Sequence, residues 1–302
     1  MQTLPVHRVA GRPTLLGDGL KVVKAGRKMP AVELMHQPGD SNTKPAYIMG
    51  HSVQVVSALV AAADSHFAVP LAGRIHEGLK FTNRDHRTLP SKCCDLLERL
   101  GLAEPFYFVS DAFYGCKTVA QRLRGSHLIS RVRRNAVAYL PAPTPTGRRK
   151  RGRPRLYGRK IKRWNLFDSD PQSWQEADSP VYGERDVTIR YLCRDLIWRP
   201  VRTLMRFVLV EHPTCSRSIF LTTDLDLPPI EVICLYGLRF KIELSVKHAL
   251  RALGSYAYTS GCAPCRGPPA APAPSTCIVL PSAIARPCAA SSPPTTATFK
   301  SA

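Results

Sequence analysis

The order of apolar runs in the first half of the chain constrains the fold most. Thr14 to Val23 reads as a strand with an acid in its middle, and the stretches from Tyr47 to Ala62 and from His66 to Ile75 are rich in apolar and β-branched residues. Runs of this composition favour extended structure. The first third of the chain therefore predicts an antiparallel sheet.

Strands and helices alternate after these runs. The stretch from Asp85 to Leu100 carries leucines at helical spacing, and Phe106 to Asp111 is a short apolar run that ends in an acid. A helix-like stretch follows from Gly115 to Leu123, and His127 to Val132 gives another strand. This order is typical of an α/β fold in which helices flank a mixed sheet.

A second, mainly β segment interrupts that unit. A proline-rich break begins at Pro141, and the strand-like runs beyond it are Val187 to Leu192, Met205 to Glu211 and Ser218 to Thr222. A helix from about Pro229 to Leu253 returns the chain to the first sheet. We therefore expect a catalytic core of residues 1–131 and 228–258, with a β-rich basic insertion at 132–227.

Three acids occupy positions from which their side chains can meet. Asp18 lies in the first strand, Asp111 ends a buried strand and Glu243 belongs to the returning helix. Metal-assisted cleavage of a phosphodiester needs carboxylates that converge on two divalent ions, and hard oxygen ligands favour Mg²⁺ or Mn²⁺. Taken singly, an Asp after a strand is more often a cap or turn residue, and a Glu on a helix is more often solvated.

The returning helix places two further groups beside Glu243. Tyr236, Arg239 and Glu243 follow one another at steps of three and four residues, so they share one face of a helix. A carboxylate beside an arginine and a phenol suits a site that holds a metal ion against a phosphodiester. Together with the two aspartates, this face indicates an enzyme that cuts DNA.

The charge of the chain points to a polyanionic partner. Its 302 residues hold 43 Lys and Arg against 22 Asp and Glu, a net charge of +21. Between Ala112 and Phe167 there are 16 basic residues and no acid. Nucleic acid is the natural partner of such a protein. A basic segment in mid-chain, flanked by strand-like runs, favours an insertion that faces DNA over a solvated surface or a flexible tail.

The most basic run of this segment extends from Gly147 to Arg155 and contains a Gly-Arg-Pro core. The pattern is similar to a hook whose arginines enter a narrow minor groove. A nonspecific phosphate clamp is the simpler alternative. Both interpretations assign DNA binding to the same side chains, which are Arg148, Arg149, Lys150, Arg151, Arg153 and Arg155.

The cysteines and the apolar runs favour a cytoplasmic protein. The ten cysteines show no metal or disulfide spacing, and the pair Cys262 and Cys265 has no second pair to complete a zinc site. The longest apolar run, Val53 to Ala63, is too short to cross a bilayer, and the N-terminus lacks the apolar core of a signal peptide.

Three blocks of the sequence together resemble a known family. Gly17-Asp18-Gly19-Leu20-Lys21, Val109-Ser110-Asp111-Ala112-Phe113-Tyr114 and the Tyr-x-x-Arg-x-x-x-Glu run that ends at Glu243 are similar to the catalytic blocks of bacterial insertion-sequence DDE transposases. The resemblance covers about residues 13–258 and indicates the branch with a β-rich insertion between the second Asp and the Glu. Its third block is the specific one.

This resemblance implies a fold, an activity and partners. The fold is an RNase H-like core, and the activity is cleavage and transfer of DNA strands at insertion-sequence ends with Mg²⁺ or Mn²⁺. Double-stranded transposon ends and target DNA are the partners, with the protein a homodimer on DNA in the cytoplasm, at the nucleoid. Two other functions stay open, a DNA-binding protein without catalysis and a general RNase H-like nuclease.

The resemblance also assigns roles to residues. Asp18, Asp111 and Glu243 are the catalytic, metal-binding acids, and Tyr236 and Arg239 hold DNA phosphate. The family pattern continues with a Lys seven residues after the Glu, whereas this chain has Leu250 there. Lys247 is a near neighbour for the same contact. The chain begins shortly before the first catalytic strand, so we expect the N-terminal DNA-recognition region of the family to be missing.

The last segment, residues 259–302, differs in composition from the rest. Pro, Ala, Ser and Thr dominate it and it contains no acid. Such a composition predicts a disordered tail. A frameshift is the sharper explanation, because a shifted reading of Thr259 to Cys265 supplies the His-Phe-Trp with which the family continues after a tyrosine such as Tyr258. The chain is then a truncated or inactive remnant.

Overall fold

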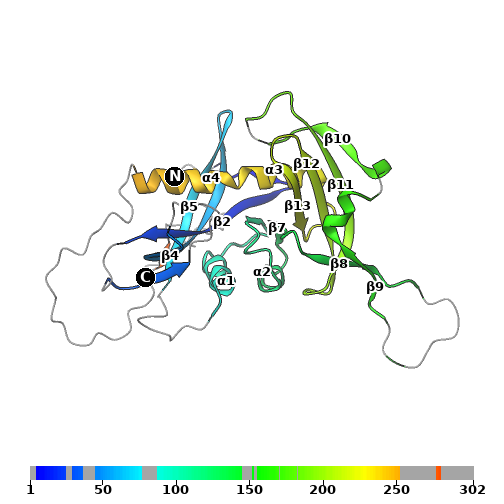
Figure 1. Cartoon of the computed structure of the whole chain (residues 1–302). Coiled ribbons are helices and arrows are strands. Elements are labelled where there is room, and N and C mark those ends of the chain that lie inside the picture. Colours follow the sequence, from blue (N-terminus) through cyan, green and yellow to red (C-terminus); the bar gives the residue numbers. More distant parts are fainter. Residues whose placement is uncertain are drawn as a thin grey trace, which may run out of the picture.

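The computed structural model describes residues 5–24, 29–36, 45–76, 87–144, 152, 155–169, 171–181, 183–251 and 277–279. Within these residues the strands form one 14-stranded sheet (Figure 1). The first half of the chain contains β1 (Arg8–Val9), β2 (Arg12–Val23), β3 (Glu33–His36), β4 (Tyr47–Ala62), β5 (Ser65–His76), α1 (Leu89–Arg99), β6 (Tyr107–Ser110), α2 (Lys117–Arg122) and β7 (His127–Arg131). The second half contains β8 (Val137–Pro141), β9 (Tyr157–Lys162), short 3₁₀ helices at Arg163–Phe167 and Pro171–Ser173, β10 (Gln175–Asp178), β11 (Thr188–Trp198), β12 (Thr203–His212), β13 (Ser216–Thr222), α3 (Pro229–Leu238), α4 (Phe240–Arg251) and β14 (Cys277–Val279).

Five strands form the centre of the sheet, in the order β5-β4-β2-β6-β7. β4 is antiparallel to both β5 and β2, whereas β6 is parallel to β2 and β7 is parallel to β6. Parallel neighbours require a crossover, and α2 supplies it between β6 and β7. The mixed sheet with helices expected from the sequence is confirmed.

Both faces of the central strands are covered. Leu15 and Phe108 pack with the residues of α1 and α2, and the next residue of each strand, Leu16 and Val109, packs with α3 and α4. All four side chains are fully buried. Figure 1 shows α1 and α2 on the opposite side of the sheet from α3 and α4. Because successive residues of a strand point to opposite faces, strands buried on both faces read as continuous apolar runs.

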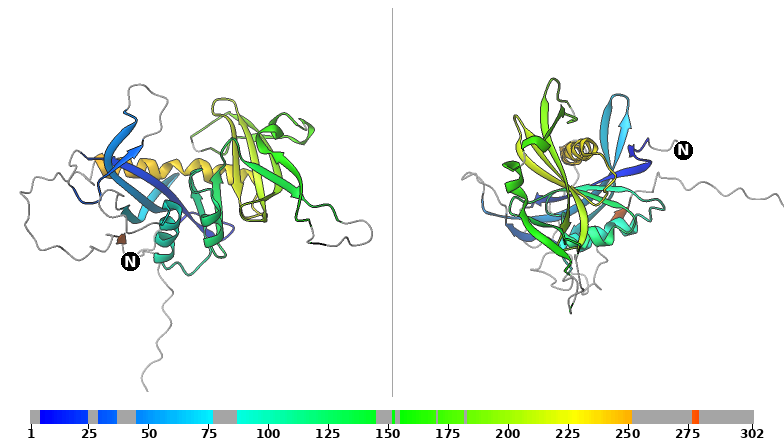
Figure 2. Two further views of the ribbon diagram at one scale, coloured as in Figure 1. Left: turned by 60° about the horizontal axis from the view of Figure 1, so that its bottom comes forward. Right: turned by 90° about the vertical axis from the view of Figure 1, so that its right-hand side faces the viewer.

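The β-rich segment is joined to the central strands through β13. β7 pairs antiparallel with β13, at Ile129 opposite Thr222, and the sheet continues through β12, β11, β8 and β9. The right-hand view of Figure 2 shows α3 and α4 nearly end-on, between these strands and the β4–β5 hairpin. The segment 132–227, expected as an insertion, therefore extends the core sheet without a break in backbone hydrogen bonding.

The helix expected from Pro229 to Leu253 is divided at Arg239. α3 ends at Leu238 and α4 begins at Phe240, while Arg239 keeps helical dihedral angles (φ −53°, ψ −36°). The two helices therefore run almost in line (Figure 1). Gly237 weakens the helix near this point. Among the described residues, no helix combines the length and the apolar character needed to cross a bilayer.

The structure differs from the expected disordered tail at Cys277–Val279. These residues form β14, which pairs antiparallel with β5, at Ile278 opposite Gly73. Without β14, β5 would be an edge strand with unpaired backbone groups, and a short β-branched segment is suited to cover such an edge. The remaining residues of the tail lie outside the described part of the chain.

Several short strands were not expected from the sequence. β8 and β9 pair with each other, at Ala138 opposite Ile161, although β9 reads Tyr-Gly-Arg-Lys-Ile-Lys and has few apolar residues. β10 is four residues long and mostly exposed. Such strands form because a neighbouring strand offers backbone partners, a contribution that apolar periodicity does not reveal.

Gly17 is required where β2 contacts β6. A Cβ atom at Gly17 would lie 2.3 Å from Cζ of the buried Phe108, whereas a Cβ at Gly237 would meet Val181 at an ordinary 3.6 Å. We expect Gly17→Ala to lower the free energy of unfolding by about 1–3 kcal/mol through overpacking. Gly237→Ala should raise it by about 0.5–1 kcal/mol, because alanine favours a helix. Urea unfolding measures both, and a neutral Gly17→Ala would contradict this packing.

Candidate active site

The pairing register brings Asp18 and Asp111 to the same level of the sheet. Gly17 of β2 lies opposite Ser110, the last residue of β6, in a parallel pair, and each aspartate is the next residue along the chain. Neighbouring strands lie about 4.8 Å apart. The two carboxylates therefore lie at the same level of adjacent strands, although the aspartates stand 93 positions apart in the sequence.

Hydrogen bonds from three residues fix Asp111. Its Oδ1 accepts the backbone N–H groups of Phe113 at 3.1 Å and of Tyr114 at 3.4 Å, and its main-chain oxygen accepts the Ser130 hydroxyl at 2.7 Å. Aspartate favours such a turn because its side chain replaces a backbone acceptor. Since Ser130 belongs to β7, the turn that carries Asp111 is attached to the next strand of the sheet.

Glu243 joins the aspartates through Arg239. One nitrogen of the Arg239 guanidinium lies 3.2 Å from Oδ2 of Asp18, and the other lies 2.6 Å from Oε1 of Glu243. The Arg239 side chain is 15% exposed and that of Asp18 is 13% exposed, whereas that of Glu243 is 53% exposed. The guanidinium therefore bridges an acid of the sheet and an acid of the helix.

Asp18 is affected by both of the other acids. Burial raises the pKa of Asp18, and the neighbouring Asp111 and Glu243 raise it further, against the opposing effects of Arg239 and of the Gly19 backbone N–H. Burial alone would lower the pKa of Arg239, but Tyr236, Asp18 and Glu243 raise it overall. The fold thus holds like charges together and compensates them with one arginine.

Tyr236 forms the wall of the site beside Arg239. Its ring lies 4.5 Å from that of Phe220 in β13, and the Arg239 guanidinium carbon lies 5.7 Å from its centroid. Burial raises the pKa of the Tyr236 phenol, and Arg239 and Arg131 act in the opposite direction. Tyr236, Arg239 and Glu243 share one side of the helix pair, as their spacing predicts.

Two residues beneath and beside the acids were not expected from the sequence. The Tyr114 hydroxyl accepts a hydrogen bond from Gln54 Nε2 at 2.8 Å and lies where a Cβ on Gly19 would be 2.9 Å away, so it packs directly under the strand of Asp18. Arg131, at the exposed end of β7, is close enough to influence Tyr236. Tyr114 belongs to the same sequence block as Asp111, which is the signal that points to it.

The expected DNA-binding residues are placed only in part. Lys247 is exposed on α4, one turn beyond Glu243, and Arg155 is exposed just before β9. The other basic residues of the run lie outside the described residues, and they are Arg148, Arg149, Lys150, Arg151 and Arg153. The structure therefore brings Asp18, Asp111, Glu243, Tyr236 and Arg239 together and leaves Lys247 near them.

A comparison with family models identifies the class of protein. A model described as DDE superfamily endonuclease matches residues 1–199, the larger part of the chain. The chain belongs to this family. The resemblance inferred from the sequence is confirmed at this level, and endonucleases of the DDE superfamily use divalent metal ions. The matched segment of this DDE superfamily endonuclease contains Asp18 and Asp111, and Glu243 lies beyond it.

A comparison with solved structures finds similarity to one described as a piggyBac transposase synaptic complex with hairpin DNA. The sequence identity is 11% and the TM-score is 0.42. The alignment covers 78% of this DDE superfamily endonuclease and 40% of that chain. No curated protein sequence matches the chain.

The acidic oxygens of this DDE superfamily endonuclease fit a divalent metal by donor type, because Mg²⁺ and Mn²⁺ prefer carboxylates. Among the described residues, the one group of His, Cys, Asp and Glu whose ligand atoms all lie within 4.8 Å of one another is a different one, formed by Glu184, His212 and Cys215. Arg239 pairs with both Asp18 and Glu243, so these two carboxylates face the guanidinium.

The group around His212 does not fit a metal. Its Nδ1 accepts the backbone N–H groups of Thr214 at 3.2 Å and Cys215 at 3.1 Å, so the ring proton lies on Nε2. Nε2 then donates to Glu184 at 2.9 Å. A metal on Nε2 would require the proton on Nδ1, facing two N–H donors. We conclude that these contacts stabilise the β12–β13 turn.

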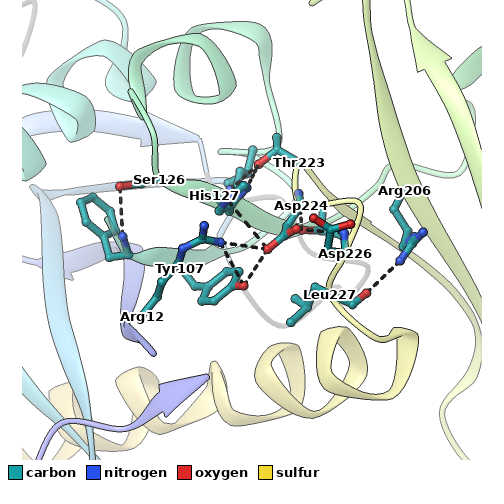
Figure 3. A network of polar contacts seen from close by, with 12 residues as sticks. Arg12, Tyr107, Ser126, His127, Arg206, Thr223, Asp224, Asp226 and Leu227 are labelled. Atoms are coloured by element: carbon teal, nitrogen blue, oxygen red, sulfur yellow. Dashed lines mark hydrogen bonds and ion pairs between the residues drawn. The ribbon is translucent and has the colours of Figure 1, made fainter. Parts of the chain in front are cut away.

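A separate acid of the DDE superfamily endonuclease, Asp224, is structural (Figure 3). Its Oδ2 accepts hydrogen bonds from the Tyr107 hydroxyl at 2.6 Å and from Arg12 at 3.1 Å. Burial opposes the charged form of Asp224, but the hydrogen bonds from Tyr107 and from the Asp226 backbone N–H outweigh it and lower the pKa. Arg12 and Tyr107 begin β2 and β6, so this network lies at the sheet edge opposite the acids.

The two acidic environments predict opposite effects of removing a charge. Asp111→Asn keeps the acceptor of its turn and relieves repulsion, so we expect the free energy of unfolding at pH 7 to rise by up to about 1 kcal/mol. Asp224→Asn weakens a buried, charge-assisted network and should lower it by about 1.5–3 kcal/mol. Urea unfolding in EDTA measures both. Equal losses in the two variants would show that Asp111 is structural as well.

Proposed function

We propose that this chain is a DNA transposase that cleaves DNA strands at insertion-sequence ends and transfers them to target DNA. The observation that carries the proposal is the convergence of Asp18, Asp111 and Glu243 in a member of the DDE superfamily endonucleases. The three acids come from two adjacent parallel strands and a helix on the same face, and the family model independently covers the first two. The bacterial insertion-sequence origin belongs to this proposal.

The strand order supports an RNase H-like core within this proposal. Three antiparallel strands are followed by two parallel ones in the order β5-β4-β2-β6-β7, with Asp18 on the central strand and Asp111 after its parallel neighbour. The core comprises residues 1–131 and 228–258, and the β-rich segment 132–227 is inserted between the second Asp and the Glu.

Asp18, Asp111 and Glu243 would hold Mg²⁺ or Mn²⁺ in the proposed mechanism. Bound divalent ions would activate the attacking water or 3′-hydroxyl and stabilise the leaving oxygen. The turn hydrogen bonds of Asp111 and the packing of Tyr114 hold the carboxylates of the sheet in position. Tyr236, Arg239 and Lys247 would bind the phosphates that flank the reacting bond. Arginine suits this role because its planar fork matches a phosphate as well as a carboxylate.

Double-stranded DNA, as transposon end and target, is the proposed partner. The net charge of +21 and the exposed basic side chains near the site, Arg131 and Lys247, supply the attraction. Two transposon ends must be brought together, and a homodimer on DNA would present one site to each. A protein with this partner would act in the cytoplasm, at the nucleoid.

The acids are tested by single conservative substitutions. We expect Asp18→Asn, Asp111→Asn and Glu243→Gln each to reduce Mn²⁺-dependent cleavage by about 1,000-fold or more, because metal-assisted charge stabilisation is worth several kcal/mol. Asp168→Asn is the control, since that aspartate is 68% exposed and pairs with Arg217 of the β-rich segment. Cleavage is measured on a labelled duplex that carries the element's end.

The products of the same assay decide between the functions. Cleavage followed by joining of the 3′-hydroxyl to a second duplex supports the transposase. Nicking without joining would identify an RNase H-like nuclease, and binding without any cleavage would identify a DNA-binding protein. Cleavage that survives Asp111→Asn would refute the assignment of the acids.

The basic run is tested through the salt dependence of DNA binding. Replacing Arg148, Arg149, Lys150 and Arg151 with Gln should reduce the slope of log affinity against log salt by up to about 0.9 for each phosphate that these side chains neutralise. The charge-matched control replaces four exposed basic residues elsewhere, namely Lys117, Arg124, Arg185 and Arg199. An equal slope change in both variants would show that only net charge matters.

A further inference from the structure

Arg239 uses the same carboxylates that a metal ion would need. Its two terminal nitrogens donate hydrogen bonds to Oδ2 of Asp18 at 3.2 Å and to Oε1 of Glu243 at 2.6 Å. The third guanidinium nitrogen, Nε, is buried and has no hydrogen-bond partner among the residues that the structure describes. The guanidinium thus pairs with two of the three acids, while its Nε donor finds no partner in the described part of the chain.

A divalent ion and Arg239 would bind the acids in competition. Both are cations, and in a half-buried site their repulsion is screened far less than in water. Carboxylate oxygens that point at a guanidinium are also turned away from an ion placed between the acids. Removing Arg239 from these oxygens requires another anion to receive it, because an unpaired, largely buried guanidinium is unfavourable.

A DNA phosphate has the shape and the charge to accept the Arg239 guanidinium. A guanidinium binds phosphate in the same two-pronged manner as carboxylate. Arg239 lies at the junction of α3 and α4, next to Tyr236 and near Arg131, where a backbone phosphate would meet several donors.

We propose that Arg239 gates the metal site, occupying Asp18 and Glu243 until a DNA phosphate draws the guanidinium away. Metal and DNA then bind with positive coupling, each raising the affinity for the other by the same factor. Without DNA two of the acids are paired with the protein's own arginine, and the metal ion binds weakly. This inference rests on the proposed function and adds a way in which DNA controls metal loading at the site.

The gate is tested by measuring Mn²⁺ binding to the full chain without DNA. The measurement is calorimetry or the electron paramagnetic resonance signal of free Mn²⁺. We expect Arg239→Gln to bind Mn²⁺ at least about five-fold more tightly than the unaltered chain. Arg190→Gln is the matched control, because Arg190 pairs with Glu211 of the β-rich segment and should leave Mn²⁺ affinity unchanged. Asp18→Asn should weaken Mn²⁺ binding.

The coupling is tested by repeating the titration with saturating duplex DNA. DNA should raise the Mn²⁺ affinity of the unaltered chain by about 5- to 150-fold, and the increase should disappear in Arg239→Gln. Arg239→Met provides a second variant if Arg239→Gln does not fold. Methionine fills the space of the aliphatic stem but carries no charge and no donor, so its Mn²⁺ affinity without DNA should also exceed that of the unaltered chain.

The outcomes separate the gate from the proposed function. Equal Mn²⁺ affinities for the unaltered chain and the Arg239 variants would overturn the gate and leave the metal-dependent function standing. An equal effect of DNA on the unaltered chain and on Arg239→Gln would also overturn it. Absence of Mn²⁺ binding in every form, with or without DNA, would refute the proposed function together with the gate.

Discussion

The parallel pairing of β2 with β6 is the constraint on which the rest of the site depends. The register that puts Gly17 opposite Ser110 also puts Asp18 beside Asp111, and a shift by one residue would send one carboxylate to the other face. Gly17 keeps this register close-packed by leaving room for Phe108. The same two strands begin at Arg12 and Tyr107, whose bonds to Asp224 hold the opposite edge. The Asp224 network at the start of the two strands therefore helps to hold the strands that carry the acids.

The fold holds the acids together although burial and their like charges oppose this arrangement. Burial and two neighbouring carboxylates disfavour the charged form of Asp18, and Arg239 compensates for them only in part. Functional sites commonly concentrate charges in this way, at a cost in stability that the surrounding packing offsets. The rigid neighbours here are the turn at Asp111, tied to β7 by Ser130, and the buried pair of Tyr114 and Gln54.

The β-rich segment is connected to the site by direct contact. β13 continues the sheet from β7, and its Phe220 packs against Tyr236 beside the acids. One strand pair and one ring contact therefore connect the β-rich segment to the site. In the proposed gate, a DNA phosphate bound near Tyr236 would also lie near the guanidinium that contacts two of the acids.

The sequence alone determined which residues form the central strands and helices. It singled out Tyr236, Arg239 and Glu243 by helical spacing, and Asp18 and Asp111 by their places in strand-like runs and by the family resemblance. Local patterns suffice for these features because a strand buried on both faces needs an apolar run, and a helix face needs steps of three and four. Only the tertiary structure decided the strand order, the register, the role of Tyr114 and the bridging position of Arg239. It also decided the strands β8 and β9, and the pairing of β14 with β5. These features depend on backbone partners and charges from distant parts of the chain, which leave no local pattern in the sequence.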